Sequence, residues 1–233
     1  MLGGCDPSAT CTAGREAYSA AWVGLGGYGE RASALEQIGT DADCARSGSA
    51  SYSTWYELLP AGPVDVRLKV HPGDELTASV TVRRNDVTLR LRDLTTGARF
   101  SVTKHASRVD TSSAEWIVEA PSACVNSSSC RVLTLADFGE VAFLNATATA
   151  RGRTGPVGGD AWSAGALELQ QSPSAALGGR TSGRLAPPAT LVLAAPSALS
   201  STSAAFSVAW SEQAVQPEQP SAPTLSGSGG GPP

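Results

Sequence analysis

Apolar and polar residues alternate through the middle of the chain. In the segment 64–70, every second residue is apolar: Val64, Val66, Leu68 and Val70. The segments 75–83, 87–93 and 98–105 repeat this period of two, and short polar turns at 71–74, 85–86 and 95–97 separate them. Strand side chains point alternately to the two faces of a sheet, so the pattern predicts an antiparallel meander.

Further strand-like segments flank this meander. They cover residues 19–25, 34–41, 52–60, 114–121, 131–139 and 140–148, with weaker candidates at 162–170, 189–195 and 204–210. A helical period is weak throughout, and residues 30–37 are its one candidate. The sequence therefore predicts an all-β protein, and its length suits a single sandwich.

The two ends of the chain differ from this central region. From residue 213 onward the sequence is rich in Pro, Ser and Gly and has almost no apolar residues to bury. We expect an N-terminal remnant at 1–16, a β-sandwich domain at 17–212 and a disordered tail at 213–233.

Composition and charge argue against nucleic acid and membrane as binding partners. The formal net charge is -4 and the sequence pI is about 5.2, whereas a nucleic-acid-binding face needs clustered basic residues. No apolar run reaches the length of about eighteen residues that a membrane helix needs. We expect a monomer that contacts neither nucleic acid nor membrane.

The five cysteines suit disulfides better than a metal. They form no C-x-x-C pair and the chain has two histidines, so we expect no metal and no cofactor. Cys124 and Cys130 bracket a short polar loop and are predicted to pair. Cys5 with Cys11 and Cys11 with Cys44 are both allowed. Disulfides indicate an extracellular protein, although residues 1–10 do not resemble a signal peptide; a chain that begins inside a longer product would reconcile the two.

Two carboxylates lie in the apolar strand at residues 114–119. Alternation places Glu115, Ile117 and Glu119 on one face, with Trp116 and Val118 on the other. An ionised Glu is rarely buried without a partner, so the acidic face should border water or a groove. The alternatives are an active site and a half-exposed strand with two solvated glutamates.

Three other chemistries are less favoured. The glycines of 24–29 satisfy G-x-G-x-x-G, but β patterning follows where a nucleotide fold needs a helix, which indicates a Gly-rich turn. His71 and His105 lie in polar segments without a nucleophile elbow, and we interpret them as surface residues. A retaining glycosidase needs carboxyl groups about 5–5.5 Å apart, whereas Glu115 and Glu119 are about 13 Å apart along a strand.

Several stretches together resemble one family. AWVG at 21–24, QIGTD at 37–41, WYELLP at 55–60, AEWIVE at 114–119 and the Cys124/Cys130 loop occur in the order of the glutamic peptidases, the eqolisins of family G1. The resemblance covers about residues 20–148. It implies a concanavalin-like antiparallel β-sandwich that cleaves polypeptides at acidic pH.

The resemblance also implies roles for individual residues. Gln37 and Glu119 match the catalytic pair, in which Glu is a general base that activates water and Gln stabilises the oxyanion. The positions that match groove-lining or supporting residues are Trp22, Trp55, Glu57 and Asp41. A glutamate base suits acid, where a histidine base would be protonated.

The sequence departs from the family pattern at several points. An acid is common soon after AWVG, where this chain continues Leu25-Gly26-Gly27. Leu59 stands where an aromatic is frequent, and Pro121, two residues after Glu119, stands where an apolar or aromatic residue is frequent. Few residues precede AWVG, so we expect a divergent, bacterial-type member with a shortened N-terminus and an exposed sheet edge. Two hypotheses follow: an acid endopeptidase, or a non-catalytic secreted β-sandwich that is a binding module or an inactive peptidase fragment.

Overall fold

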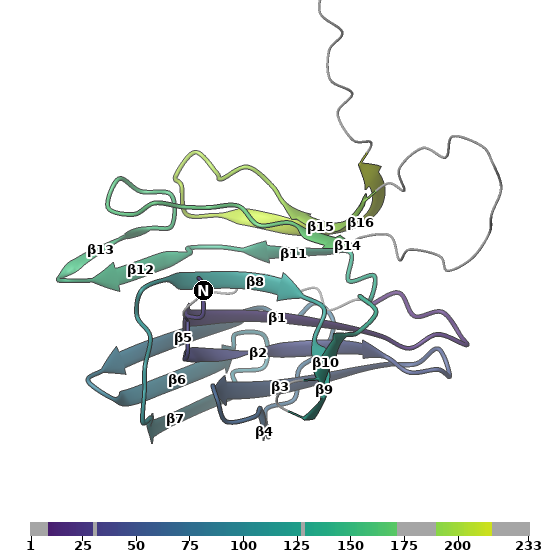
Figure 1. Cartoon of the computed structure of the whole chain (residues 1–233), viewed down its shortest axis with the longest axis horizontal. Helices are drawn as coiled ribbons and strands as arrows, with labels where there is room; N and C mark the ends of the chain where they lie inside the picture. Colours follow the sequence, from purple (N-terminus) through teal and green to yellow (C-terminus); the bar gives the residue numbers. More distant parts are fainter. Residues whose placement is uncertain (1–8, 30–31, 127–128, 172–189, 216–233) are drawn as a thin grey trace, which may run out of the picture.

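The computed structural model describes residues 9–29, 32–126, 129–171 and 190–215. All the regular secondary structure within these ranges is β-strand (Figure 1). Every strand pair within these ranges is antiparallel, and the strands form five sheets. The predicted all-β antiparallel sandwich is confirmed. Within the same ranges, no helix is long and apolar enough to cross a membrane.

A five-stranded sheet carries the acidic stretch. Its order is β4-β3-β2-β1-β8, and each neighbouring pair is antiparallel. The bounds are β1 (Ala17–Gly26), β2 (Leu35–Cys44), β3 (Ala50–Leu58), β4 (Val64–Val66) and β8 (Ala114–Glu119). β8 returns to the sheet beside β1, so the AEWIVE and AWVG motifs lie on adjacent strands.

The faint helical period at residues 30–37 gives no helix in the described residues 32–37, and the strand-like segment predicted at 34–41 forms β2. Leu35 already begins β2, which pairs along its whole length with β1 on one side and β3 on the other. Two continuous hydrogen-bonded ladders outweigh a weak local helical period, because tertiary pairing commonly overrides propensity.

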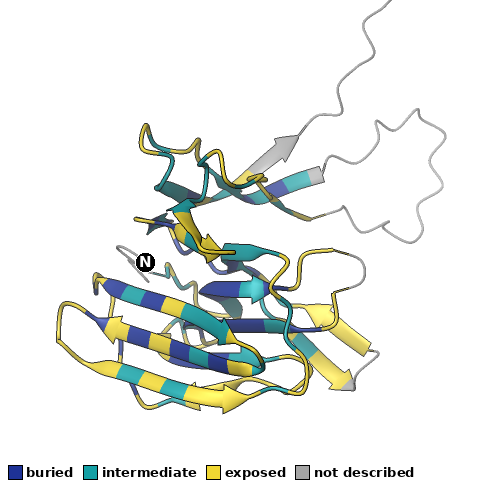
Figure 2. Cartoon of the chain, turned by 90° about the vertical axis from the view of Figure 1, so that its left-hand side faces the viewer, coloured by how far each residue is buried: buried dark blue, intermediate teal, exposed yellow. Residues whose placement is uncertain are grey.

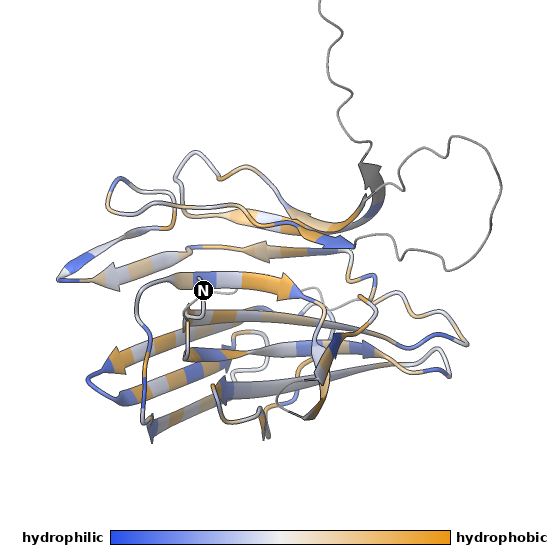
Figure 3. Cartoon of the chain, viewed as in Figure 1, coloured by the Kyte–Doolittle hydropathy of each residue, from blue (hydrophilic) through white to orange (hydrophobic). Residues whose placement is uncertain are grey.

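The meander forms a three-stranded sheet of β5 (Leu76–Arg83), β6 (Asp86–Asp93) and β7 (Arg99–His105). Buried and exposed residues alternate along β6 (Figure 2), as do hydrophobic and hydrophilic ones (Figure 3). The predicted turn at 95–97 forms because the Asp93 carboxylate accepts hydrogen bonds from the Thr95 and Thr96 amides, at 2.8 and 3.0 Å.

The segment 64–70 does not join the meander as predicted. Its strand is only three residues long and pairs with β3. The hydroxyl of Thr54 on β3 donates to the carbonyls of Val66 and Leu68, at 3.1 and 2.8 Å, which holds the segment against β3. Leu68 and Val70 are buried as the alternation requires, but Val64 is exposed.

The remaining strands follow β8. A hairpin is formed by β9 (Ser122–Asn126) and β10 (Ser129–Val132), and a second by β12 (Thr147–Ala150) and β13 (Arg153–Pro156). A four-stranded sheet of order β11-β16-β15-β14 comprises β11 (Glu140–Phe143), β14 (Leu169–Gln171), β15 (Thr190–Pro196) and β16 (Phe206–Val215). β16 runs three residues into the predicted tail, and residues 216–233 lie outside the described ranges.

One apolar core connects the sheets. Strands β5 and β6 pack on β1 and β2, and the same cluster includes residues of β11, β15 and β16. Val118 on β8 is buried in it and Trp116 packs against it, as predicted for that face of the acidic strand. Its fully buried members include Ile38, Leu89 and Phe143, each contributing about 1.5–3 kcal/mol by leaving water.

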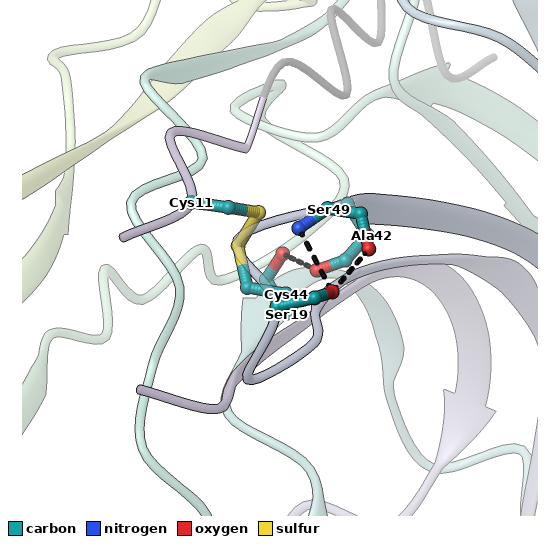
Figure 4. The surroundings of a disulfide bond; sticks show 6 residues. Cys11, Ser19, Ala42, Cys44 and Ser49 are labelled. Atoms are coloured by element: carbon teal, nitrogen blue, oxygen red, sulfur yellow. Dashed lines mark hydrogen bonds between the residues drawn. A yellow bond between two sulfur atoms is a disulfide. The ribbon is translucent and has the colours of Figure 1, made fainter. Parts of the chain in front are cut away.

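Two disulfides brace the start of β1 and the end of β8. The predicted Cys124–Cys130 bond closes the β9–β10 hairpin. Cys11 pairs with Cys44, which selects between the two possibilities left open by the sequence; Cys5 lies outside the described residues. Close to the Cys11–Cys44 bond, the Ser19 hydroxyl donates to the Ala42 carbonyl at 3.0 Å (Figure 4). The segment before β1 is thereby fixed to the sheet.

Candidate active site

One face of the five-stranded sheet gathers the six residues to which the resemblance assigns catalytic or supporting roles, which are Gln37, Glu119, Trp22, Trp55, Glu57 and Asp41. Residues paired across antiparallel strands share a face, and so do residues two apart on one strand. We call this the acidic face. Its three cross-strand rows are Glu57–Gln37–Gly24–Glu115, Asp65–Trp55–Gly39–Trp22–Ile117 and Ser53–Asp41–Ala20–Glu119.

Gln37 is oriented by Glu57. The side chain of Gln37 is buried, and its Nε2 donates to Oε2 of Glu57 at 2.6 Å. Burial raises the pKa of Glu57, and the hydrogen bond from Gln37 opposes that rise. A carboxylate only accepts, so Glu57 fixes which end of the amide carries its two N–H donors. Among the described residues, buried Oε1 of Gln37 has no hydrogen-bond partner.

Glu119 is oriented by Trp22. The indole Nε1 of Trp22 donates to Oε1 of Glu119 at 3.1 Å. Burial raises the pKa of Glu119, and the nearby charges of Glu57 and Glu115 add to that rise, while the indole hydrogen bond lowers it. Glu57 therefore acts on both residues: its charge raises the pKa of Glu119, and its carboxylate accepts the hydrogen bond from Gln37.

Asp41 is held in the same way by the second tryptophan. Nε1 of Trp55 donates to Oδ1 of Asp41 at 2.7 Å, and the Ser53 hydroxyl approaches Oδ2 at 3.4 Å. Burial raises the pKa of Asp41 to about 6. Each tryptophan therefore orients one carboxyl on the acidic face, and the two indoles form a small buried cluster with Ala20.

Asp43 is a member of this face that the sequence reasoning missed. It lies two residues after Asp41, opposite Tyr18 on β1, and burial raises its pKa to about 6. Its Oδ1 is buried and has no hydrogen-bond partner within the part of the chain that the structure describes. The signal was present in the sequence, because Gln37, Gly39, Asp41 and Asp43 follow one another at every second position of β2.

Glu36 lies on the opposite face of β2. It is 1% exposed, and its Oε1 accepts a hydrogen bond from the Asp110 amide at 3.2 Å. Burial raises the pKa of Glu36 to about 7. The side chain is therefore neutral in acid, and it ties the segment before β8 to β2.

Gly39 keeps the space for Trp22. A Cβ at this position would lie 2.5 Å from the Cβ of Trp22 and would also meet the carbonyl oxygen of Ala21. Backbone atoms cannot swing away as a flexible side chain can, so the two central strands would have to separate.

Replacing Gly39 with Ala should therefore destabilise the sheet. We expect a loss of about 1–3 kcal/mol, as for overpacking in other cores, and a fall in Tm of several degrees by differential scanning calorimetry. Gly62→Ala is the matched control, because a Cβ there meets no atom within 4 Å. Equal melting temperatures for the two variants would refute the assignment of Gly39 as a spacer.

The alternative chemistries find no support on this face. His71 and His105 are exposed and approach Asp74 and Asp86. Their interpretation as surface residues is confirmed. The glycines of 24–29 end β1, and the next element is β2 rather than a helix. In the described part of the chain, no group of three or more His, Cys, Asp or Glu side chains is arranged to hold a metal ion.

Comparisons with known proteins identify relatives of this chain and of its fold. Aspergillopepsin-2 of Aspergillus niger is 33% identical over 145 residues, 60% of this chain and 49% of that protein. The chain thus spans about half the length of this curated relative. Aspergilloglutamic peptidase from Aspergillus niger superimposes with a TM-score of 0.63 at 27% identity, covering 84% of this chain and 99% of the other.

A second solved structure shares the fold. Scytalido-glutamic peptidase, in a crystal structure with a transition state analog inhibitor, gives a TM-score of 0.66 at 22% identity, over 90% of this chain and 95% of that one. The model of the peptidase A4 family matches residues 6–182, which is well over half of the chain and includes every motif of the acidic face. The chain therefore belongs to the peptidase A4 family, the glutamic peptidases that its motifs resemble.

Proposed function

We propose that the chain is an acid endopeptidase in which Glu119 and Gln37 act on one water molecule and one scissile carbonyl. The observation that carries the proposal is that both side chains lie on one sheet face, each held by a dedicated partner. Pre-oriented groups need little reorganisation during the reaction, which is the main source of electrostatic catalysis.

Glu119 acts as the general base. Trp22 occupies Oε1, so Oε2 remains for the water. The Glu119 carboxylate takes one proton from the water while the water oxygen attacks the scissile carbonyl carbon, and a tetrahedral oxyanion forms. The same proton then passes to the leaving amine nitrogen as the C–N bond breaks, which restores the carboxylate and yields an acid and an amine.

Gln37 stabilises the oxyanion. Its Nε2 carries two hydrogens, of which Glu57 accepts one. The second is the donor to the negative oxygen of the tetrahedral intermediate. An amide does not titrate in the acid range, so this donor persists at any pH where Glu119 works.

The test is cleavage of an unfolded, reduced protein between pH 3 and 6, with new termini identified by mass spectrometry. The proposal predicts internal cleavages at several peptide bonds, with a rate that falls at the acid end of this range as Glu119 becomes protonated. Binding of the polypeptide without any new termini would instead support the non-catalytic binding module. The two disulfides support an oxidising compartment, and we extend the proposal to a secreted protein.

Trp22→Phe should shift the acid limb of the pH–rate profile to higher pH. The indole hydrogen bond lowers the pKa of Glu119, and the base must be ionised to work, so removing the bond keeps Glu119 protonated at higher pH. A hydrogen bond to a charged group contributes about 1.5–3 kcal/mol, so kcat/KM at the acid end should fall by roughly tenfold or more.

The control for this variant is Trp55→Phe, which removes a hydrogen bond to Asp41 instead of Glu119. The measurement is kcat/KM against pH with a fluorogenic peptide. An acid limb that stays in place in Trp22→Phe would contradict the role of Trp22 in tuning the base.

A further inference from the structure

A pocket of about 340 Å³ lies beside the start of β1, and three arginines line it. They are Arg15, Arg46 and Arg131, and they share the pocket with Glu16 and Tyr18. We call this the arginine pocket. Neither the catalytic pair nor its supporting residues belong to it.

The arginines come from three separate parts of the chain. Arg15 precedes β1, Arg46 lies in the turn between β2 and β3, and Arg131 lies on β10. The amide of Gly14 donates to the Arg46 carbonyl at 2.8 Å, and the amide of Tyr18 donates to the Thr134 carbonyl at 2.8 Å. These bonds join the three segments around the pocket.

Both disulfides strengthen this arrangement. Arg46 follows Cys44 by two residues, and Cys44 is bonded to Cys11, four residues before Arg15. Arg131 directly follows Cys130, which closes the β9–β10 hairpin with Cys124. The pocket walls are therefore cross-linked, which reduces the conformational freedom that a ligand would otherwise have to restrict.

The pocket is positive on a protein that is negative overall. Three arginines and one glutamate line the pocket, whereas the chain as a whole has a formal net charge of -4. Nε of Arg46 lies 3.9 Å from Oε1 of Glu16, and both side chains are largely exposed, so this pair is weak. Arg15 and Arg131 form no ion pair with another described residue. Their charge is available to a ligand.

The pocket adjoins the Glu119 end of the acidic face. Tyr18 lines the pocket and lies two residues before Ala20, the cross-strand partner of Glu119, so it is about 7 Å along the strand from that position. On the other side, the amide of Leu133, which also lines the pocket, donates to the Pro121 carbonyl at 2.9 Å. A peptide bound across the acidic face would reach the pocket within a few residues, because an extended chain advances about 3.3 Å per residue.

We propose that the arginine pocket binds a carboxylate of the polypeptide substrate, supplied either by an acidic side chain or by the chain's own C-terminus. The inference rests on the proposed peptidase function. Guanidinium groups recognise carboxylates through paired hydrogen bonds and stay charged at every working pH. The adjacent carboxyls of Asp41 and Asp43, whose pKa values burial raises to about 6, are mostly neutral in acid and do not compete for the arginines.

Binding by the uncleaving Glu119→Gln variant tests the inference at pH 5, where substrate carboxylates are ionised. Fluorescence anisotropy would measure the binding of a series of labelled peptides that are otherwise uncharged and carry a single Glu at successive positions. Each peptide is compared with a counterpart in which Gln replaces that Glu. Every peptide is made with a free and an amidated C-terminus, which separates the two sources of carboxylate. Adding Arg46→Gln or Arg131→Gln should weaken binding of the preferred acidic peptide by roughly tenfold and leave its neutral counterpart unchanged.

The matched control is Arg90→Gln, which removes the same charge from an exposed position on β6. Three results would each overturn the inference. They are an equal loss of binding in this control, equal binding of acidic and neutral peptides when the arginines are unsubstituted, and no binding of any peptide. Circular dichroism checks that the variants fold.

Kinetics with the otherwise unaltered chain separate this inference from the function on which it rests. If cleavage is normal but shows no preference for acidic peptides, the pocket assignment is wrong and the peptidase proposal stands. If nothing is cleaved while arginine-dependent binding persists, the peptidase proposal fails and the carboxylate pocket stands.

Discussion

Glu119→Gln should lower kcat by about 10³-fold or more, with KM within a few-fold of the parent value. The amide keeps the shape of the side chain and can still accept the Trp22 indole hydrogen bond, but it cannot take a proton from water. An interaction needed only in the transition state lowers kcat and kcat/KM equally, so substrate affinity should persist. The measurement is steady-state hydrolysis of a fluorogenic peptide at the optimum pH of the parent.

Glu115→Gln is the matched control for this variant. Glu115 shares the strand, the face and a raised pKa with Glu119, but it accepts its hydrogen bond from the Ser113 hydroxyl at 2.9 Å, and its cross-strand partner is Gly24. Its kcat should stay within a few-fold of the parent. Equal losses in the two variants, or a large loss only in Glu115→Gln, would show that the base is assigned to the wrong glutamate.

Gln37→Ala should lower kcat by about 10²–10³-fold, the usual cost of removing one oxyanion donor. The change also removes the partner of Glu57, so Glu57 would be left half-buried without its hydrogen bond and the fold should lose about 1–3 kcal/mol. Activity must therefore be measured well below the melting temperature of the variant. Calorimetry on the same samples gives the stability loss.

Gln170→Ala controls for the substitution itself, because Gln170 is an exposed residue of β14 that bonds Glu168. It should leave kcat unchanged. A Gln37→Ala variant with parental kcat, once its folded fraction is allowed for, would remove Gln37 from the mechanism.

The sequence predicted the acidic face better than it predicted the sheet order. Alternation alone placed Glu115 and Glu119 on one side of β8 and Val118 on the other, because the period of two is a property of every strand. The pairing of β8 with β1 joins residues 97 apart, such as Trp22 and Glu119, and no local pattern specifies so distant a contact. The resemblance to a family assigned Trp22 and Glu119 to the same groove, but it did not predict the pairing of their strands.

Tertiary pairing overrode two local signals in the sequence. Residues 30–37 had a faint helical period, but β2 gains a ladder on both sides. The segment 64–70 alternates well, yet Thr54 holds it against β3 instead of the meander. The arginine pocket had no signal in the sequence, since its arginines lie in three separate segments that only the fold brings together.

The most direct test of the central claim is a double-mutant cycle with Glu119→Gln and Gln37→Ala, read as single-turnover cleavage of one peptide. If both side chains act on the same water and carbonyl, the double variant should be no more than a few-fold slower than Glu119→Gln alone, because residues that act as a unit are not additive. If the two losses instead multiply, Glu119 and Gln37 act independently, and the proposed mechanism is wrong.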